Sequence, residues 1–214
     1  MKPRIDYSLY LATGRAFLRG RDLAAVVEEA VAAGVTLVQL REKTAGAREF
    51  YEIGRRLHAV TRRLRVPLII NDRLDIALAL DAEGIHVGQD DLPLERVRAL
   101  APGRIVGFSV QTVADAEFAA RTGADYLGVG PVFTTATKAD AGDALGVEGL
   151  RRVVAASPLP CVAIGGITPA NAEAVMACGV AGCCVISALL GAPDLSAAVT
   201  AFRPIVRPPH PRDG

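Results

Sequence analysis

The stretch IVGFSVQTVADAEFAARTGADYLGVG, residues 105–130, contains every part of a strand–helix–strand unit. It begins with an apolar run at residues 105–108 and ends with a second one at residues 126–130. Between them, Thr112 can cap a helix over residues 113–122 and Gly123 can end it, because a threonine side chain accepts free N–H groups and glycine adopts left-handed conformations. The stretch therefore predicts one β–α–β unit.

The same alternation extends in both directions along the chain. Asp22 can cap a helix over residues 23–33, residues 45–64 have helical periodicity, and Thr168 with Pro169 can open a helix that ends before Gly179. Short apolar runs rich in Val, Ile and Leu predict eight strands, at residues 8–12, 36–40, 67–70, 84–87, 105–108, 126–130, 161–164 and 183–186.

The spacing of these strands indicates the fold class. Strand follows strand at intervals of roughly 25 residues, the size of a β–α unit, and nearly continuous apolar strands are typical of a parallel sheet covered on both faces. Eight such units predict a single-domain α/β protein, a (β/α)8 TIM barrel. A doubly wound open sheet has the same local pattern and is the alternative. We expect the barrel to span residues 1–206 and residues 207–214 to form a flexible, proline-rich tail.

Composition excludes several classes of protein. Apolar residues make up 51% and charged residues 22%, which excludes wholesale disorder, and a net charge of +1 excludes a general basic surface for nucleic acid. The N-terminus has no apolar signal segment, and four cysteines without a CxxC pair are typical of a reduced, cytoplasmic protein. Residues 174–192 carry no charge, but their glycines favour a buried helix–turn–strand segment over a membrane span. A homo-oligomer remains open.

Cations follow the second predicted strand, where a parallel barrel places its active site. Gln39, Arg41 and Lys43 alternate along the chain and so share one face, and Lys138 offers a third cation after the sixth strand. This arrangement favours an anionic ligand. The alternative is a set of solvated charges paired with surface acids.

Two carboxylates follow the third and fourth strands. Asp72 and Asp91 could share a hard cation, since Mg²⁺ takes one or two carboxylates together with water and substrate phosphate oxygens. With the cations nearby, a magnesium–polyphosphate site is favoured. Asp90 is the adjacent alternative ligand, and the competing interpretation is that Asp72 caps a helix while Asp91 occupies a polar turn.

A second anion site is predicted after the last two strands. Gly165 and Gly166 let a phosphate approach the backbone, and Ile186 with Ser187 begins a short helix whose N–H groups can bind it. Two anion sites in one barrel mouth suit the joining of two phosphorylated small molecules, one of which loses diphosphate.

Five segments together resemble the thiamine-phosphate synthase family over residues 7–203: QLREK at 39–43, INDR at 70–73, GIHVGQDD at 84–91, GPVFTTATK at 130–138 and IGGIT at 164–168. The resemblance implies a (β/α)8 barrel that joins 4-amino-2-methyl-5-(diphosphooxymethyl)pyrimidine to 4-methyl-5-(2-phosphoethyl)thiazole, giving thiamine phosphate and diphosphate. It implies that Mg²⁺ is held by Asp72 and Asp91. It further implies that the pyrimidine diphosphate is bound by Gln39, Leu40, Arg41, Glu42, Lys43, Asn71, Ser109 and Lys138, and the thiazole phosphate by Thr135, Ala136, Thr137, Gly166, Ile186 and Ser187.

The implied mechanism needs charge and positioning rather than a general base. Mg²⁺ with Arg41, Lys43 and Lys138 would neutralise the departing diphosphate, and the thiazole nitrogen would attack the pyrimidine methylene carbon. We therefore expect His58 and His86 to be structural.

The chain departs from the family pattern at two places. Thr134 stands where a proline is common, which leaves the stiffness of its loop open, and residues 12–14 (ATG) stand where members often carry Asp. Two rival functions remain: a thiazole tautomerase-like isomerase of the same superfamily, which generally lacks the full magnesium and diphosphate set, and a non-catalytic binder of thiamine phosphate. We expect small-molecule substrates and neither nucleic-acid nor membrane partners.

Overall fold

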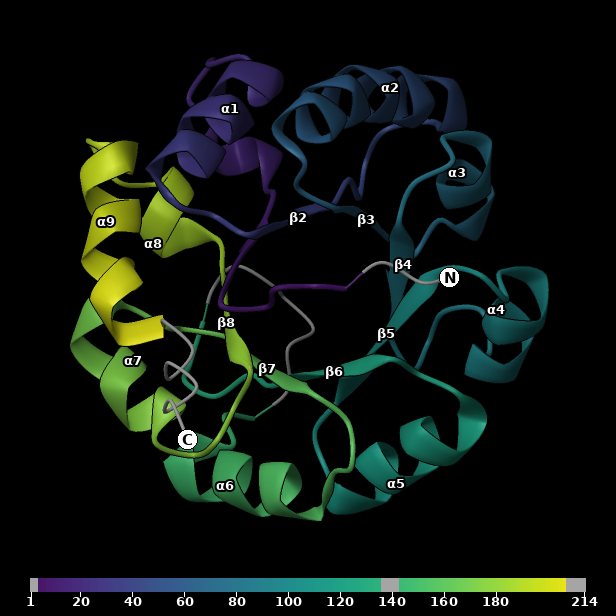
Figure 1. Ribbon diagram of the computed structural model, residues 1–214, viewed down its shortest axis with the longest axis vertical. Helices are drawn as coiled ribbons and strands as arrows, with labels where there is room; N and C mark the ends of the chain where they lie inside the picture. The colour runs from purple at the N-terminus through teal and green to yellow at the C-terminus, as the bar shows by residue number, and fades with distance from the viewer. Residues whose placement is uncertain (1–3, 136–142, 207–214) are drawn as a thin grey trace, which may run out of the picture.

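Eight parallel strands close into a barrel with each strand paired to its neighbours in sequence (Figure 1). The computed structural model describes residues 4–135 and 143–206. β1 pairs with both β2 and β8, so the sheet has no free edge and the open-sheet alternative is wrong. The predicted (β/α)8 barrel is confirmed. Its strands are β1 (Leu9–Ala12), β2 (Leu37–Leu40), β3 (Leu68–Asn71), β4 (Gly84–Val87), β5 (Ile105–Val110), β6 (Tyr126–Val129), β7 (Cys161–Ile164) and β8 (Gly182–Val185).

Helices surround the strands as an outer ring (Figure 1). The Asp22 side chain accepts the Ala25 N–H at 3.1 Å and caps α1, and Thr112 with Asp115 forms a reciprocal capping box on α5, so these two starts follow from the sequence. The helices are η1 (Arg15–Phe17), α1 (Leu23–Ala33), α2 (Ala47–Leu64), α3 (Leu74–Ala79), α4 (Leu94–Leu100), α5 (Val113–Thr122), α6 (Gly146–Ala156), α7 (Pro169–Met176), α8 (Ser187–Leu190) and α9 (Leu195–Val206).

Two hydrophobic cores follow from the alternation of side chains along each strand. One face of each strand packs against the helix ring and forms the larger core. The other face fills the barrel interior with a smaller cluster that includes Tyr10, Ile69, Tyr126 and Val162. Because the interior is packed at this level, space for a ligand is left only nearer the rim.

Residues 174–192 fold as the end of α7, then β8 and α8, in agreement with the expected helix–turn–strand segment. Among the helices of residues 4–135 and 143–206, none combines the length and apolar character needed to cross a bilayer. Cys161, Cys178, Cys183 and Cys184 are buried and free, as their apolar surroundings predict. The expected tail, residues 207–214, lies outside the described residues.

Candidate active site

One cavity of about 340 Å³ opens at the carboxyl ends of the strands. Strand alternation predicts that Gln39, Arg41 and Lys43 project to one side, and all three line this cavity. Most of the other predicted residues also line this cavity: Asn71, Asp72, Asp91, Ser109, Thr135, Gly166, Ile186 and Ser187.

The ion pair between Lys43 and Asp72 joins the ends of β2 and β3. Lys43 Nζ lies 2.6 Å from Asp72 Oδ2. Asp72 has a φ of +61°, a left-handed conformation that aspartate tolerates better than most residues, and its N–H donates to the His86 carbonyl at 2.8 Å. The backbone after β3 is thus turned and tied to β4, which holds the Asp72 carboxylate at the rim.

The Asp72 and Asp91 side chains both line the cavity and are close enough for Asp72 to affect the pKa of Asp91. Burial raises the pKa of Asp91, and the neighbouring Asp72 raises it further, while the Gly88 N–H, 2.7 Å from Asp91 Oδ2, and Lys43 act in the opposite direction. Two carboxylates that disfavour each other's charge fit a divalent cation, which relieves that repulsion. Within the described residues, no cluster of three or more His, Cys, Asp or Glu side chains gathers as a metal site. Asp90, the alternative ligand, also lines the cavity and is exposed.

The two positions after β7 require glycine, because the backbone there is left-handed and neighbouring atoms pack closely against it. Gly165 and Gly166 have φ values of +101° and +65°, in the region that favours glycine. A Cβ on Gly166 would lie 2.8 Å from Phe133 Cβ, and one on Gly165 would lie 2.6 Å from Pro131 Cα. The β6–α6 loop therefore packs directly on this backbone, and Gly166 still lines the cavity beside the start of α8.

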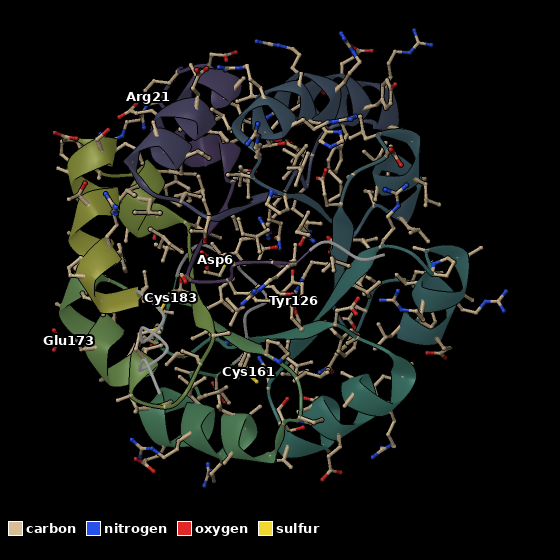
Figure 2. The ribbon with its side chains drawn as sticks, in the orientation of Figure 1. Asp6, Arg21, Tyr126, Cys161, Glu173 and Cys183 are labelled. Atoms are coloured by element: carbon tan, nitrogen blue, oxygen red, sulfur yellow. The ribbon has the colours of Figure 1, made fainter. Side chains whose placement is uncertain are left out.

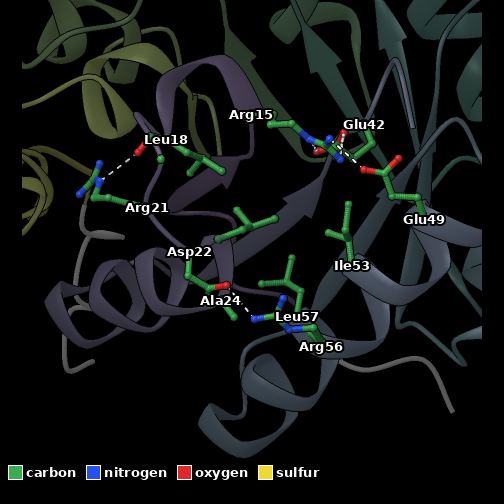
Figure 3. Close-up of a pocket in the computed structure, with 12 residues that line it drawn as sticks. Arg15, Leu18, Arg21, Asp22, Ala24, Glu42, Glu49, Ile53, Arg56 and Leu57 are labelled. Atoms are coloured by element: carbon green, nitrogen blue, oxygen red, sulfur yellow. Dashed lines mark hydrogen bonds and ion pairs between the residues drawn. The ribbon is translucent and has the colours of Figure 1, made fainter. Parts of the chain in front are cut away.

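Leu40 and Glu42 have side chains on the opposite face from the cavity. Leu40 is fully buried in the core between strands and helices. The Glu42 side chain is only 4% exposed and lies 3.0 Å from Arg15, which also contacts Glu49 at 2.9 Å (Figure 3). Alternation explains both placements, since these residues are out of phase with Gln39 and Lys43. Ala136, Thr137 and Lys138 lie outside the described residues.

A second hollow of about 420 Å³ lies outside the barrel among η1, α1 and α2 (Figure 3). Arg15 there is paired with Glu42, and Arg56 with Asp22 at 2.7 Å. Arg21 donates to the Leu190 carbonyl at 3.1 Å. These three cations all have partners, and the hollow is lined by as many carboxylates as cations, so it shows no charge that calls for an ionic ligand.

Sequence reasoning did not place two tyrosines and one histidine in the wall of the cavity. Tyr10, Tyr126 and His86 line its base, and Figure 2 labels Tyr126 inside the barrel. For His86 we expected a structural role. The alternation that groups residue 86 with residues 84 and 88 could have placed this histidine inside the barrel. His58 instead lies on α2, 3.3 Å from Glu83.

The backbone of Arg41 is held by a residue at the end of β1. Its N–H donates to Thr13 Oγ1 at 3.0 Å, in the segment that departs from the family pattern. Thr13 therefore holds the backbone of a predicted diphosphate-binding residue in place.

Comparison with known proteins identifies close relatives. A thiamine-phosphate synthase of Syntrophomonas wolfei is 51% identical over 201 residues, 94% of this chain and 96% of the relative. Another, of Chloroflexus aurantiacus, is 47% identical and covers 94% of each chain. The solved structure of a thiamine phosphate pyrophosphorylase from Pyrococcus furiosus superposes with a TM-score of 0.86 at 42% identity, covering 94% of this chain and 96% of that one.

More distant barrels share the fold alone. A 3-hexulose-6-phosphate synthase superposes with a TM-score of 0.69 at 17% identity. By contrast, the family model described as thiamine monophosphate synthase matches residues 9–189, nearly the whole barrel. The predicted family is therefore confirmed: this chain belongs to the thiamine monophosphate synthase family.

Proposed function

We propose that this protein is a thiamine-phosphate synthase. It transfers the 4-amino-2-methylpyrimidin-5-ylmethyl group from its diphosphate to 4-methyl-5-(2-phosphoethyl)thiazole and releases diphosphate. Relatives named thiamine-phosphate synthase share about half of their residues with this protein over almost the whole chain, which supports this function. The observation that carries it is the single cavity in which Arg41, Lys43 and the Asp72–Asp91 pair meet the Gly166 backbone.

The reaction balances without a proton acceptor. The bond between the methylene carbon and the diphosphate oxygen breaks, with its electron pair leaving on the diphosphate. The thiazole nitrogen supplies the pair for the new C–N bond. Positive charge at the leaving group and correct alignment of two substrates are therefore the main requirements.

A divalent cation, Mg²⁺ in our proposal, supplies positive charge to the diphosphate when it is bound. Asp72 and Asp91 are its protein ligands, and the mutual repulsion of their carboxylates favours that role. Arg41 and Lys43 bind the diphosphate from the β2 side, and Lys138 adds a third cation in the proposal. Their guanidinium and ammonium groups balance the charge that develops as the bond breaks.

The thiazole phosphate binds on the other side of the same cavity. Its phosphate accepts hydrogen bonds from the backbone at Gly166 and from Ile186 and Ser187 at the start of α8. Thr135, with Ala136 and Thr137 beyond it in the sequence, contributes from the β6–α6 loop. Asn71 and Gln39 contact the pyrimidine from β3 and β2.

The test is a reaction of purified protein with both substrates and Mg²⁺, followed by chromatography of the products. Formation of thiamine phosphate with one equivalent of diphosphate, abolished by a metal chelator, supports the proposal. Tautomerisation of the thiazole alone would identify the isomerase instead. Tight binding of thiamine phosphate without turnover would identify a non-catalytic binder.

A further inference from the structure

Five side chains at the base of the cavity form one continuous chain of hydrogen bonds. Gln39 Nε2 lies 2.9 Å from the Tyr10 hydroxyl, which lies 3.0 Å from the Tyr126 hydroxyl. Tyr126 in turn lies 2.9 Å from His86 Nδ1, and His86 Nε2 lies 3.0 Å from Ser109 Oγ. The chain crosses five strands, β2, β1, β6, β4 and β5, and both of its ends line the cavity.

The atoms at one end determine the direction of the chain. An amide nitrogen can only donate, so Tyr10 accepts from Gln39 and gives its own proton to Tyr126. Burial raises the pKa of both tyrosines well above the usual value, so both hydroxyls keep their protons. Tyr126 has then accepted from Tyr10, and its proton goes to His86 Nδ1.

This direction fixes the tautomer of His86. Because Nδ1 accepts a proton from Tyr126, a neutral ring carries its proton on Nε2, which donates to Ser109. With the proton on Nδ1, Tyr126 would face two donors, and its own proton would lose its acceptor in the chain. Tyr126 is 0% exposed, so that proton could not turn to solvent instead.

We propose that Tyr10, Tyr126 and His86 are positioning residues that make Ser109 a hydrogen-bond donor toward the ligand. Ser109 accepts from His86, and its hydroxyl proton remains to donate into the cavity. A ligand ring with an acceptor nitrogen matches this polarity, and a ring that offers a donor there does not. The inference rests on the proposed function in that an aminopyrimidine supplies such ring nitrogens.

The first test measures the His86 tautomer directly in the ligand-free protein. Long-range ¹H–¹⁵N correlation spectra distinguish the Nε2–H, Nδ1–H and doubly protonated forms of a histidine ring. We expect the Nε2–H form, because the chain of hydrogen bonds places a donor opposite Nδ1 and an acceptor opposite Nε2. Either of the other forms would overturn the inference, whatever reaction the enzyme performs.

The second test breaks the chain with Tyr126→Phe, which removes one hydroxyl and keeps the ring. The matched control is Tyr7→Phe, because the Tyr7 ring lies 4.9 Å from that of Tyr126 but its hydroxyl is not part of the chain. We expect Tyr126→Phe to raise the KM for the pyrimidine diphosphate roughly tenfold, equivalent to about 1.4 kcal/mol. The KM for the thiazole phosphate should stay as in the wild type, since a purely structural defect would disturb both.

Melting curves and the histidine spectra accompany the kinetics of both variants. A folded Tyr126→Phe protein that retains the Nε2–H tautomer and the wild-type KM for the pyrimidine diphosphate would contradict the inference. If the wild-type protein makes no thiamine phosphate, the proposed function fails, while the tautomer measurement still decides whether the chain has the inferred direction.

Discussion

Replacing Asp91 by Asn should make the ligand-free protein more stable and less able to bind metal. Burial and the neighbouring Asp72 both disfavour the charged form of Asp91, which is why its pKa is raised. Asn removes that charge and keeps an oxygen that can accept the Gly88 N–H, now 2.7 Å from Asp91 Oδ2. The change therefore removes a repulsion with little loss of hydrogen bonding.

The size of the gain follows from the charges around the site. At an effective dielectric constant near 20, two unit charges at a contact distance of about 4 Å repel by about 4 kcal/mol. Lys43 Nζ, 2.6 Å from Asp72 Oδ2, offsets most of that repulsion, and partial exposure of Asp91 screens it further. A net gain of about 1 kcal/mol remains, which corresponds to a melting temperature about 2–4 °C higher for a domain of this size.

The gain should depend on pH in one direction only. When the pKa of a carboxyl group is higher in the folded state than in the unfolded state, the free energy of unfolding falls as the pH rises through the folded-state pKa. Wild-type and Asp91→Asn proteins should therefore melt alike in acid, where Asp91 is protonated in both folded and unfolded states. They should differ at neutral pH.

Differential scanning fluorimetry with and without Mg²⁺ measures both effects. A ligand present at about 100 times its Kd stabilises by about 2.7 kcal/mol, so wild-type protein should gain about 5–10 °C. Asp91→Asn should lose most of that shift, whereas Asp90→Asn, at the exposed neighbouring carboxylate, should keep it. An Asp91→Asn protein that is less stable without metal, or that retains the full Mg²⁺ shift, would refute the reasoning.

Three further changes test other parts of the site. Gly166→Val should raise the KM for the thiazole phosphate roughly tenfold. It should also lower the melting temperature, because the φ of residue 166 is +65° and a Cβ there would meet Phe133 at 2.8 Å. An unaltered KM in a folded variant would contradict the placement of the phosphate. Arg15→Ala should destabilise the fold by about 1–3 kcal/mol in chemical denaturation. The change removes the cation beside the Glu42 carboxylate, whose side chain is only 4% exposed. Arg15→Lys should restore part of the lost stability. Lys138→Ala should lower kcat on the order of a hundredfold without a change in melting temperature, and full activity would remove it from the diphosphate site.

The fold followed from the sequence wherever a local signal was strong. The strands β4 and β7 and the helices α1 and α5 begin and end where the apolar runs and the caps Asp22 and Thr112 predict. The sequence pattern did not identify α3 or α4, because six or seven residues are too few to show helical periodicity. Periodicity also could not predict that the barrel closes, because the pairing of β1 with β8 joins residues that are far apart in the chain.

The rim of the candidate site was easier to predict than its base. At the rim, charged residues follow apolar strands, and alternation sorts Arg41 and Lys43 from Glu42 without any knowledge of their partners.

At the base of the cavity, the arrangement depends on tyrosines and glycines within strands, which the sequence does not distinguish from ordinary core residues. A Cβ on Gly107 would collide with both Tyr126 and His86, so this glycine makes room for the hydrogen-bonded pair on neighbouring strands. A glycine inside a strand signals a close approach, but the sequence does not say what approaches. The register of β5 against β4 and β6, which pairs Gly107 with His86 and Tyr126, supplies that information. The polarity that we infer for Ser109 thus depends on three strands meeting in one register. A shift of β4 or β6 by one residue would turn His86 or Tyr126 out of the barrel, and a shift of β5 would turn out Ser109 itself.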